Sequence, residues 1–263
     1  MTRVLAIANQ KGGVGKTTTA VNISAAMAVD GLRTLLVDLD PQGNATTGVG
    51  VDPRSPNPSM YQVLVEDAPI ADVITATDID GLYVAPSRME LAGAELELVA
   101  AFSRETKLRN ALGSVRGQYD FVVIDCPPSL GLLTVNGLTA AEELVIPVQC
   151  EYYSLEGLGQ LLHNVDLVKQ SLNPGLATTA IVLVMFDART KLAQQVADEV
   201  RAHFGDTVCR IVIPRSVRVT EAPSHGMPVI TYDRSSRGAV AYRLLAQEIV
   251  SRRPHPETGG TAQ

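Results

Sequence analysis

Residues 11–18 read Lys11-Gly12-Gly13-Val14-Gly15-Lys16-Thr17-Thr18, and this stretch decides the fold class of the 263-residue chain. An apolar run (3–8) precedes it and a helical pattern (16–29) follows it. Glycines let backbone N–H groups turn toward a phosphate without Cβ atoms in the way, and the N-terminus of the next helix adds partial positive charge. The order strand, loop, helix therefore predicts a phosphate-binding loop.

Within this loop, Lys16 is expected to reach the β- and γ-phosphates of a nucleotide and act in catalysis, and the Thr17 hydroxyl to ligate Mg²⁺ directly. The other loop residues expected to bind the nucleotide are Lys11, Gly12, Gly13, Val14, Gly15 and Thr18. The usual pattern needs glycine at position 10, where this chain has Gln10, and Lys11 is an additional lysine. Lys11 is either a solvated surface lysine or a cation offered to a phosphate across a dimer interface.

Apolar runs alternate with helical patterns along the rest of the chain. Strands are predicted at 3–8, 34–37, 82–85, 121–124, 144–148 and 179–184, and helices at 16–29, 92–98, 105–114, 155–171 and 192–204. Near-continuous apolar strands are typical of parallel sheets covered on both faces. We predict a single α/β domain (1–253) with one doubly wound, mostly parallel sheet and helices on both faces. The proline-containing segment 52–59 is expected to be a surface loop and the polar tail 254–263 to be disordered.

Composition limits the class of protein. The chain is 46% hydrophobic and no stretch approaches the ~18 apolar residues of a spanning helix. The N-terminal apolar run is too short for a secretory signal. The three cysteines, Cys126, Cys150 and Cys209, lie far apart and are expected to be buried thiols in a reducing compartment. These features favour a cytoplasmic protein.

Charge is distributed unevenly. The formal net charge is −6, yet residues 186–243 carry 9 Lys and Arg against 6 Asp and Glu, whereas residues 1–185 carry 11 against 20. A local cationic face on an acidic protein can still bind a polyanion. No helix-turn-helix, zinc pattern or aromatic interleaving indicates recognition of particular bases.

Several motifs resemble the ParA/MinD class of ATPases with a deviant Walker A loop, and most closely its short chromosomal ParA (Soj) branch. Besides the loop, these motifs are Asp38-Leu39-Asp40-Pro41-Gln42-Gly43-Asn44, Asp125-Cys126-Pro127-Pro128 and Pro223-Ser224-His225-Gly226. The match runs along almost the whole chain. The resemblance implies that Lys11 acts in catalysis by contacting the partner subunit's nucleotide, and that Gly12 permits close approach of two subunits.

Asp38, Asp40 and Asp125 each end an apolar run, where ligands of a parallel sheet lie. The resemblance implies that Asp40 orients the lytic water, while Asp125 and Asp38 support Mg²⁺ through water. It places Pro214 and Arg215 near the adenine. Met185 and Phe186 are either neighbours of the base or apolar core residues, and the core role is the expectation.

The resemblance also implies partners. ParA proteins bind double-stranded DNA nonspecifically as ATP-bound dimers through basic residues of the late region, here expected to be Arg189, Arg215 and Arg218. A ParB-type centromere-binding protein would stimulate hydrolysis, and the protein would be nucleoid-associated.

Three other classes of protein share some of these sequence features. A MinD-like membrane-associated ATPase that positions cell division is the main alternative, because residues 242–253 form a helical candidate with apolar Leu244, Leu245, Ile249 and Val250. These residues are expected instead to pack the helix onto the domain, so no membrane partner is expected. An iron–sulfur reductase would need paired cysteine motifs, and a metabolic ligase or kinase a substrate pocket that the sequence does not reveal.

Overall fold

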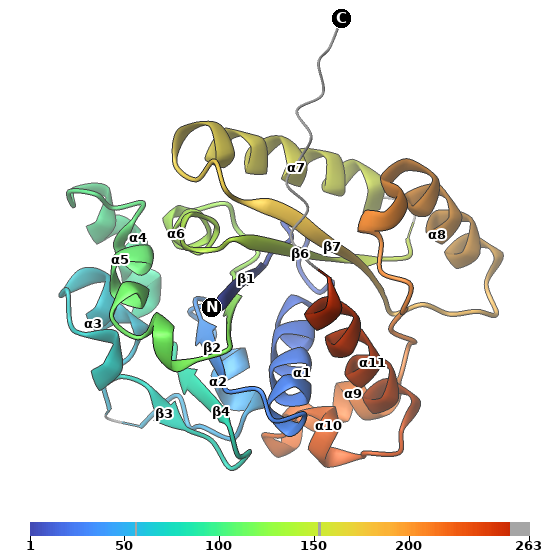
Figure 1. Cartoon of the computed structure of the whole chain (residues 1–263), viewed down its shortest axis with the longest axis horizontal. Coiled ribbons are helices and arrows are strands. Elements are labelled where there is room, and N and C mark those ends of the chain that lie inside the picture. Colours follow the sequence, from blue (N-terminus) through green and yellow to red (C-terminus); the bar gives the residue numbers. More distant parts are fainter. Residues whose placement is uncertain (56, 152–153, 253–263) are drawn as a thin grey trace, which may run out of the picture.

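The structure is a computed structural model that describes residues 1–55, 57–151 and 154–252. Within them, one seven-stranded sheet has the order β3-β4-β2-β5-β1-β6-β7 (Figure 1). The strands are β1 (Arg3–Ile7), β2 (Thr34–Asp38), β3 (Thr75–Ala76), β4 (Leu82–Ala85), β5 (Phe121–Asp125), β6 (Glu143–Gln149) and β7 (Ala177–Val184). All neighbours pair in parallel except β3, which is antiparallel to β4. The predicted mostly parallel sheet is confirmed.

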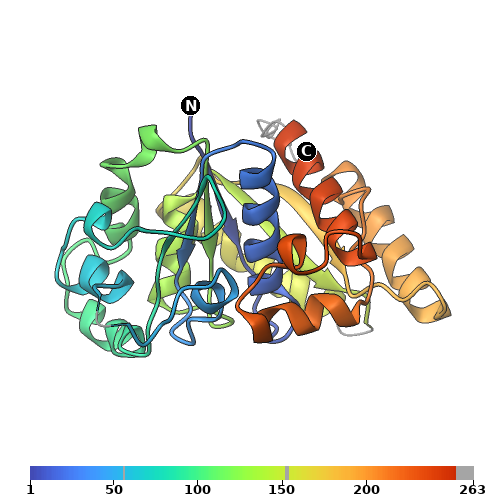
Figure 2. The same cartoon turned by 90° about the horizontal axis from the view of Figure 1, so that it is seen from below.

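Helices cover both faces of the sheet (Figures 1 and 2). They are α1 (Lys16–Val29), α2 (Asn44–Gly48), α3 (Met60–Val65), α4 (Leu91–Val99), α5 (Lys107–Gly113), α6 (Leu132–Ala140), α7 (Ser154–Ser171), α8 (Lys191–Phe204), α9 (Val217–Glu221), α10 (Val229–Tyr232) and α11 (Arg237–Ser251). Side chains alternate across each strand, so Val4 and Ala6 join the core under α3 to α8, while Leu5 and Ile7 join the core under α1 and α11.

The sequence-based prediction misses α6 and begins α11 five residues late, at 242 instead of Arg237. The helices α1, α4, α5, α7 and α8 and the six predicted strands lie within two residues of their expected bounds. β-branched residues, an asparagine and a glycine give α6 low intrinsic helix propensity. Tertiary contacts stabilise it. Asn136 accepts from Leu108 N at 3.1 Å and donates to Arg104 O at 2.7 Å. A Cβ added at Gly137 would lie 2.7 Å from the Cys126 sulfur, so only glycine permits this packing.

The first strand and the last helix meet in space. α1 packs against α11, and the Arg3 guanidinium pairs with the buried Glu143 at 2.6 Å. Arg3 also donates to Val250 O at 2.8 Å and to Ile249 O at 3.1 Å. These bonds fix α11 beside the helix that begins at the glycine-rich loop.

The sequence also carries expectations about the cysteines, the segment 52–59 and the C-terminal region. The three cysteines are buried and free. The described residues of the segment 52–59 form no helix or strand, as expected of a loop, and Gly31 adopts a left-handed conformation beyond α1, with φ of +87°. α11 begins earlier than the predicted 242–253. Residue 253 and the tail 254–263, for which disorder was expected, lie outside the described residues.

Candidate functional site

The glycine-rich loop leaves β1 and enters α1 through left-handed backbone. Gly13 has φ of +74°, and Gly15, the residue that precedes the first turn of α1, has φ of +80°. Such angles favour glycine at both positions. Gly12 is different, because its φ is not left-handed and an added Cβ would meet no described atom within 4 Å. The described residues therefore give no reason for glycine at position 12.

Lys16 lies inside this loop. Its side chain is buried and its Nζ donates to Lys11 O at 3.2 Å. Burial lowers the pKa of Lys16, while Asp125 and Asp40 act in the opposite direction. Lys16 and the carboxylates are thus close enough to interact, as the positions of Asp125 and Asp40 at strand ends predict.

Two carboxylates lie side by side at the carboxyl ends of the neighbouring strands β2 and β5. Asp38 pairs in register with Asp125 on β5, and both are fully buried. Burial raises the pKa of Asp38 to about 6; burial and then the charge of Asp38 raise the pKa of Asp125 well above its usual range. Neither oxygen of Asp125 has a hydrogen-bond partner among the described residues. A buried carboxylate without partners is costly and fits a site completed by a cation.

The donor set also fits Mg²⁺ bound mainly by phosphate and water. No group of three or more His, Cys, Asp or Glu side chains within the described chain could hold a metal unaided. Mg²⁺ commonly keeps several waters and takes one or two protein ligands beside substrate phosphates. Thr17, at the start of α1, interacts with Asp125 closely enough to lower its pKa. These are the residues that would hold the ion.

Asp38 is bonded within its own segment. Its Oδ1 accepts from Asp40 N at 3.1 Å, and its Oδ2 accepts from Thr46 N at 2.8 Å and from the Thr46 hydroxyl at 2.7 Å. Asp40 is 9% exposed and its Oδ1 accepts from Gln42 N at 3.0 Å. No motif spacing links Thr46 to Asp38, so Thr46 is not recognisable from the sequence; only the folding of α2 onto β2 brings the two residues together.

A cavity of about 300 Å³ opens beside the loop. Residues expected near the adenine line it, and the lining includes Gly15, Thr18, Met185, Pro214, Arg215 and Tyr242. Met185 has φ of +53° and its Cε would contact a Cβ placed on Gly15. Phe186 is not among the lining residues but supports the cavity through its backbone. It donates to Ile213 O at 3.0 Å and accepts from Arg215 N at 3.1 Å.

Lys11 is bonded outside the loop. Its Nζ lies 2.9 Å from Oε2 of Glu151, beyond the end of β6, and the two side chains are 38% and 52% exposed. The Lys11 backbone N–H donates to Asn9 Oδ1 at 3.0 Å, and Asn9 donates to Pro147 O at 2.7 Å. The start of the loop is therefore tied to β6, and the Lys11 ammonium sits at its exposed mouth.

In the late region Arg189 and Arg218 are exposed and paired with acids, and Arg215 is exposed. Arg189 makes two bonds to Asp187, at 2.9 and 2.7 Å, which lower the pKa of Asp187 to about 2; Arg215 adds to this effect. An isolated bridge between Phe186 and Pro214 holds their two segments together. Arg218, on α9, pairs with Glu221 at 2.9 Å and with Asp233 at 3.4 Å.

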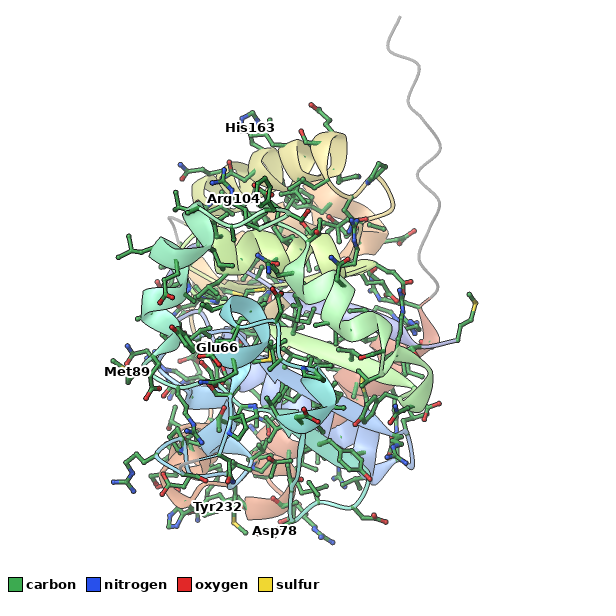
Figure 3. All side chains as sticks on the ribbon, turned by 90° about the vertical axis from the view of Figure 1, so that its left-hand side faces the viewer. Glu66, Asp78, Met89, Arg104, His163 and Tyr232 are labelled. Carbon is green, nitrogen blue, oxygen red and sulfur yellow. The ribbon has the colours of Figure 1, made fainter. Side chains whose placement is uncertain are left out.

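The Pro223–Gly226 motif packs on α2. Gly226 has φ of +64°, and a Cβ added there would lie 3.4 Å from Thr47 O. The His225 ring stacks on Tyr232, which Figure 3 labels, with centroids 4.9 Å apart. This late segment therefore contacts the helix that follows Asp40.

Some of the apolar residues of α11 pack into the core, and others are exposed. Leu245 and Ile249 are fully buried in the core beneath α1 and α11, whereas Leu244 is 45% exposed. None of the described helices combines the length and apolar character required to cross a bilayer.

Comparisons with known proteins agree with this geometry. Residues 2–178 match a family described as an AAA domain. The sporulation initiation inhibitor protein Soj of Bacillus subtilis is 55% identical over 251 residues, covering 95% of this chain and 99% of Soj. The chromosome partitioning protein ParA of Caulobacter vibrioides is 52% identical, covering 95% and 94%.

A solved structure adds a similar fold. Cobyrinic acid a,c-diamide synthase from Mycobacterium smegmatis, with bound ADP and magnesium, has a TM-score of 0.83 at 41% identity, covering 94% of this chain and 93% of that one. The sequence relatives extend over nearly the whole chain at 52–55% identity. The chain therefore belongs to the ParA/Soj family of chromosome-partitioning P-loop ATPases.

Proposed function

We propose that this partitioning ATPase binds ATP and Mg²⁺, pairs with a second copy over two nucleotides, binds DNA nonspecifically as the dimer, and releases DNA after hydrolysis. The loop of residues 11–18 would hold the phosphates, with Lys16 on the β- and γ-phosphates. Thr17 would ligate Mg²⁺, and Asp125 and Asp38 would hold its water shell. The ion supplies positive charge that offsets the phosphate charge. The cavity beside Gly15, with Pro214 and Arg215, would take the adenine.

The position of Lys11 carries the proposal of a dimer. Its ammonium is at the mouth of the loop, in an exposed pair with Glu151 rather than folded over its own loop. Exposed pairs of this kind contribute about 0–1 kcal/mol, so a phosphate of a second protomer can replace Glu151 at little cost. Gly12 supports the same proposal, because no contact among the described residues requires glycine at that position.

DNA binding is proposed for Arg189, Arg215 and Arg218. Arginines that neutralise phosphates bind without regard to sequence, and each contact steepens the salt dependence. A dimer would present two sets of these arginines to one duplex and so about double the phosphate contacts. ATP would thereby switch on DNA binding and hold the protein at the nucleoid.

Hydrolysis would return the protein to the monomer. Asp40, close to Lys16 at the sheet edge, would orient the attacking water while ionised, as water-positioning residues do in other phosphoryl-transfer enzymes. We propose slow intrinsic turnover that a ParB-type centromere-binding protein accelerates.

The decisive experiment measures sedimentation and DNA retardation with ATP, ADP and no nucleotide, with anionic lipid vesicles as a parallel arm. The wild type should dimerise and bind DNA with ATP alone. Lys11→Ala should keep its ATP affinity within about threefold and lose dimerisation and turnover. Glu151→Ala is the matched control: it breaks the same ion pair but keeps Lys11, so it should still dimerise.

Two results would contradict the proposal. ATP-dependent binding to vesicles without DNA retardation would favour the MinD-like alternative. Normal dimerisation of Lys11→Ala would remove the role of that lysine in trans. Asp40→Ala should remain on DNA as an ATP dimer, and rapid hydrolysis by this variant would remove the role of Asp40.

A further inference from the structure

Thr46 links Asp38, at the end of β2, to the segment that follows the neighbouring strand β4. It is fully buried in α2, and its hydroxyl donates to Asp38 Oδ2 at 2.7 Å. The same hydroxyl accepts from Ser87 N at 3.0 Å, just beyond the end of β4. A hydroxyl has one proton to donate, so these two bonds fix its direction. Since β4 pairs in register with β2, the sheet itself anchors Thr46.

The segment between Asp38 and Thr46 carries Asp40. Asp38 binds both ends of this segment: Oδ1 accepts from Asp40 N at 3.1 Å, and Oδ2 accepts from Thr46 N at 2.8 Å besides the hydroxyl. The turn between them closes with Gly43 N donating to Asp40 O at 2.9 Å. One buried carboxylate therefore holds the entry and the exit of the Asp40 turn.

The neighbouring segments leave this turn little room to move. A Cβ added at Gly43 would lie 3.3 Å from both Ser87 O and the Pro53 side chain. The Thr46 hydroxyl is thus the side-chain connection between a closely packed turn and the strand behind it. None of the bonds made by Thr46 reaches the loop of residues 11–18, which is the part proposed to bind phosphate.

We infer that Thr46 is a positioning residue for hydrolysis: its hydroxyl, held by Ser87, orients the Asp38 carboxylate and thereby fixes the backbone from which Asp40 projects. The inference rests on the role proposed for Asp40. A small displacement of a group that orients the attacking water should lower the rate of hydrolysis more than the affinity for ATP. The position of that water matters in the transition state and not in the binding of ATP. Loss of the hydroxyl should therefore slow hydrolysis and leave ATP binding intact.

The experiment compares single-turnover hydrolysis of ATP with ATP affinity in matched variants. Thr46→Val keeps the branched shape but removes the hydroxyl, and it should hydrolyse ATP at least about tenfold more slowly, with affinity within about threefold of wild type. Thr46→Ser restores the hydroxyl and should recover the rate to within about threefold. Thr47→Val removes an exposed hydroxyl of the same helix, one that donates to Gly43 O at 3.0 Å, and should hydrolyse like the wild type.

A double variant tests whether Thr46 acts through Asp40. Thr46→Val in an Asp40→Ala background should be no slower than Asp40→Ala alone, because residues that act as one unit are not additive. A further tenfold loss would overturn the inference, as would a wild-type rate in Thr46→Val or an equal loss in Thr46→Ser. Wild-type hydrolysis by Asp40→Ala would instead refute the role of Asp40 itself.

Thermal unfolding separates positioning from structural damage. A rate loss in Thr46→Val accompanied by equal losses of affinity and thermal stability would overturn the inference. Should Thr46→Val fail to fold, Thr46→Ala takes its place. It leaves room where the hydroxyl was and should likewise hydrolyse slowly at unchanged affinity.

Discussion

The phosphate edge, formed by the loop of residues 11–18 with Asp38, Asp40 and Asp125, differs in physical character from the arginine surface, formed by Arg189, Arg215 and Arg218. At the phosphate edge, charges are buried, and Asp125 has no hydrogen-bond partner among the described residues. On the arginine surface, Arg189 is 86% exposed and Arg218 is 54% exposed, and both already have acidic partners. The first region contains a buried carboxylate without a hydrogen-bond partner, whereas two arginines of the second region already pair with acids of their own chain.

The difference determines how large the effect of a substitution should be. Buried charges that lack partners carry a desolvation cost of several kcal/mol, whereas exposed ion pairs contribute about 0–1 kcal/mol. Substitutions at the phosphate edge should therefore change binding or stability strongly. Those on the arginine surface should cause smaller changes that depend on salt.

The largest effect is expected for Lys16→Ala. Removal of a buried cation from among the phosphate-binding N–H groups should weaken ATP binding at least about 100-fold, which corresponds to about 2.7 kcal/mol. Calorimetric titration with a non-hydrolysable ATP analogue measures it. Lys11→Ala is the control because its ammonium lies at the exposed mouth. If both variants lost affinity equally, the two lysines would not differ in role.

Asp125→Asn should stabilise the nucleotide-free protein while weakening its response to Mg²⁺ and ATP. The folded-state pKa of Asp125 is raised, as is that of Asp38, to about 6. Carboxyls with raised pKa values stabilise the fold fully below their unfolded pKa, near 4, and this contribution is lost as pH rises through the folded-state value. Wild-type stability should therefore fall between about pH 4 and 6 from Asp38, and Asp125 should add to the fall as the pH rises through its own raised pKa.

Denaturant unfolding at pH 7.5 checks this prediction. Asp125→Asn should be more stable by about 1–3 kcal/mol, because burial and the charge of Asp38 disfavour the ionised carboxyl more than Thr17 and Lys16 favour it. Asp78→Asn is the control, since Asp78 is exposed and lies before the start of β4, at the opposite end of the sheet from Asp38. Equal stability of Asp125→Asn and wild type would mean that the buried charge is compensated within the chain.

Arg189→Ala should weaken DNA binding of the ATP dimer about tenfold, and Arg218→Ala similarly, with ATP affinity unchanged. Each should lower the slope of log K against log salt by about 2, one phosphate contact per protomer. Retardation or anisotropy across a salt series measures this slope. Arg54→Ala is a matched control, because Arg54 pairs with Asp52 two positions earlier just as Arg189 pairs with Asp187. An equal loss in Arg54→Ala would refute a localised DNA surface.

The smallest effect is expected for Glu151→Gln. Without the Glu151 charge, Lys11 is released, and ATP-dependent dimerisation should become stronger by at most about fivefold per protomer, the range of an exposed ion pair. Ultracentrifugation at low and high salt measures the change, which should shrink at high salt because screening weakens the wild-type pair. Glu66→Gln, another exposed glutamate, should have no effect. Weaker dimerisation of Glu151→Gln would mean that Glu151 aids the interface instead.

The two regions also differ in how far the sequence could predict them. Residues of the phosphate edge occupy a continuous loop or the ends of strands, so the alternation of strands and helices was enough to predict that Asp40 and Asp125 lie near Lys16. Pairing partners were not predictable in this way. Glu151 meets Lys11, and Ser87 meets Thr46, across 140 and 41 positions of chain. Such contacts depend on packing, as does α6, whose composition alone disfavours a helix.

The contact between α1 and α11 has a consequence for synthesis on the ribosome. Arg3 bonds to the carbonyl of Val250, 247 positions later, and the helix that begins with Lys16 and Thr17 is covered by the last helix of the described chain. Contacts of such long sequence separation form late in folding. The packing around α1, the helix that follows the glycine-rich loop, can therefore be completed only when almost all of the chain has been translated. A message truncated within α11 would yield an aggregation-prone chain with the apolar face of α1 uncovered, rather than a partly active ATPase.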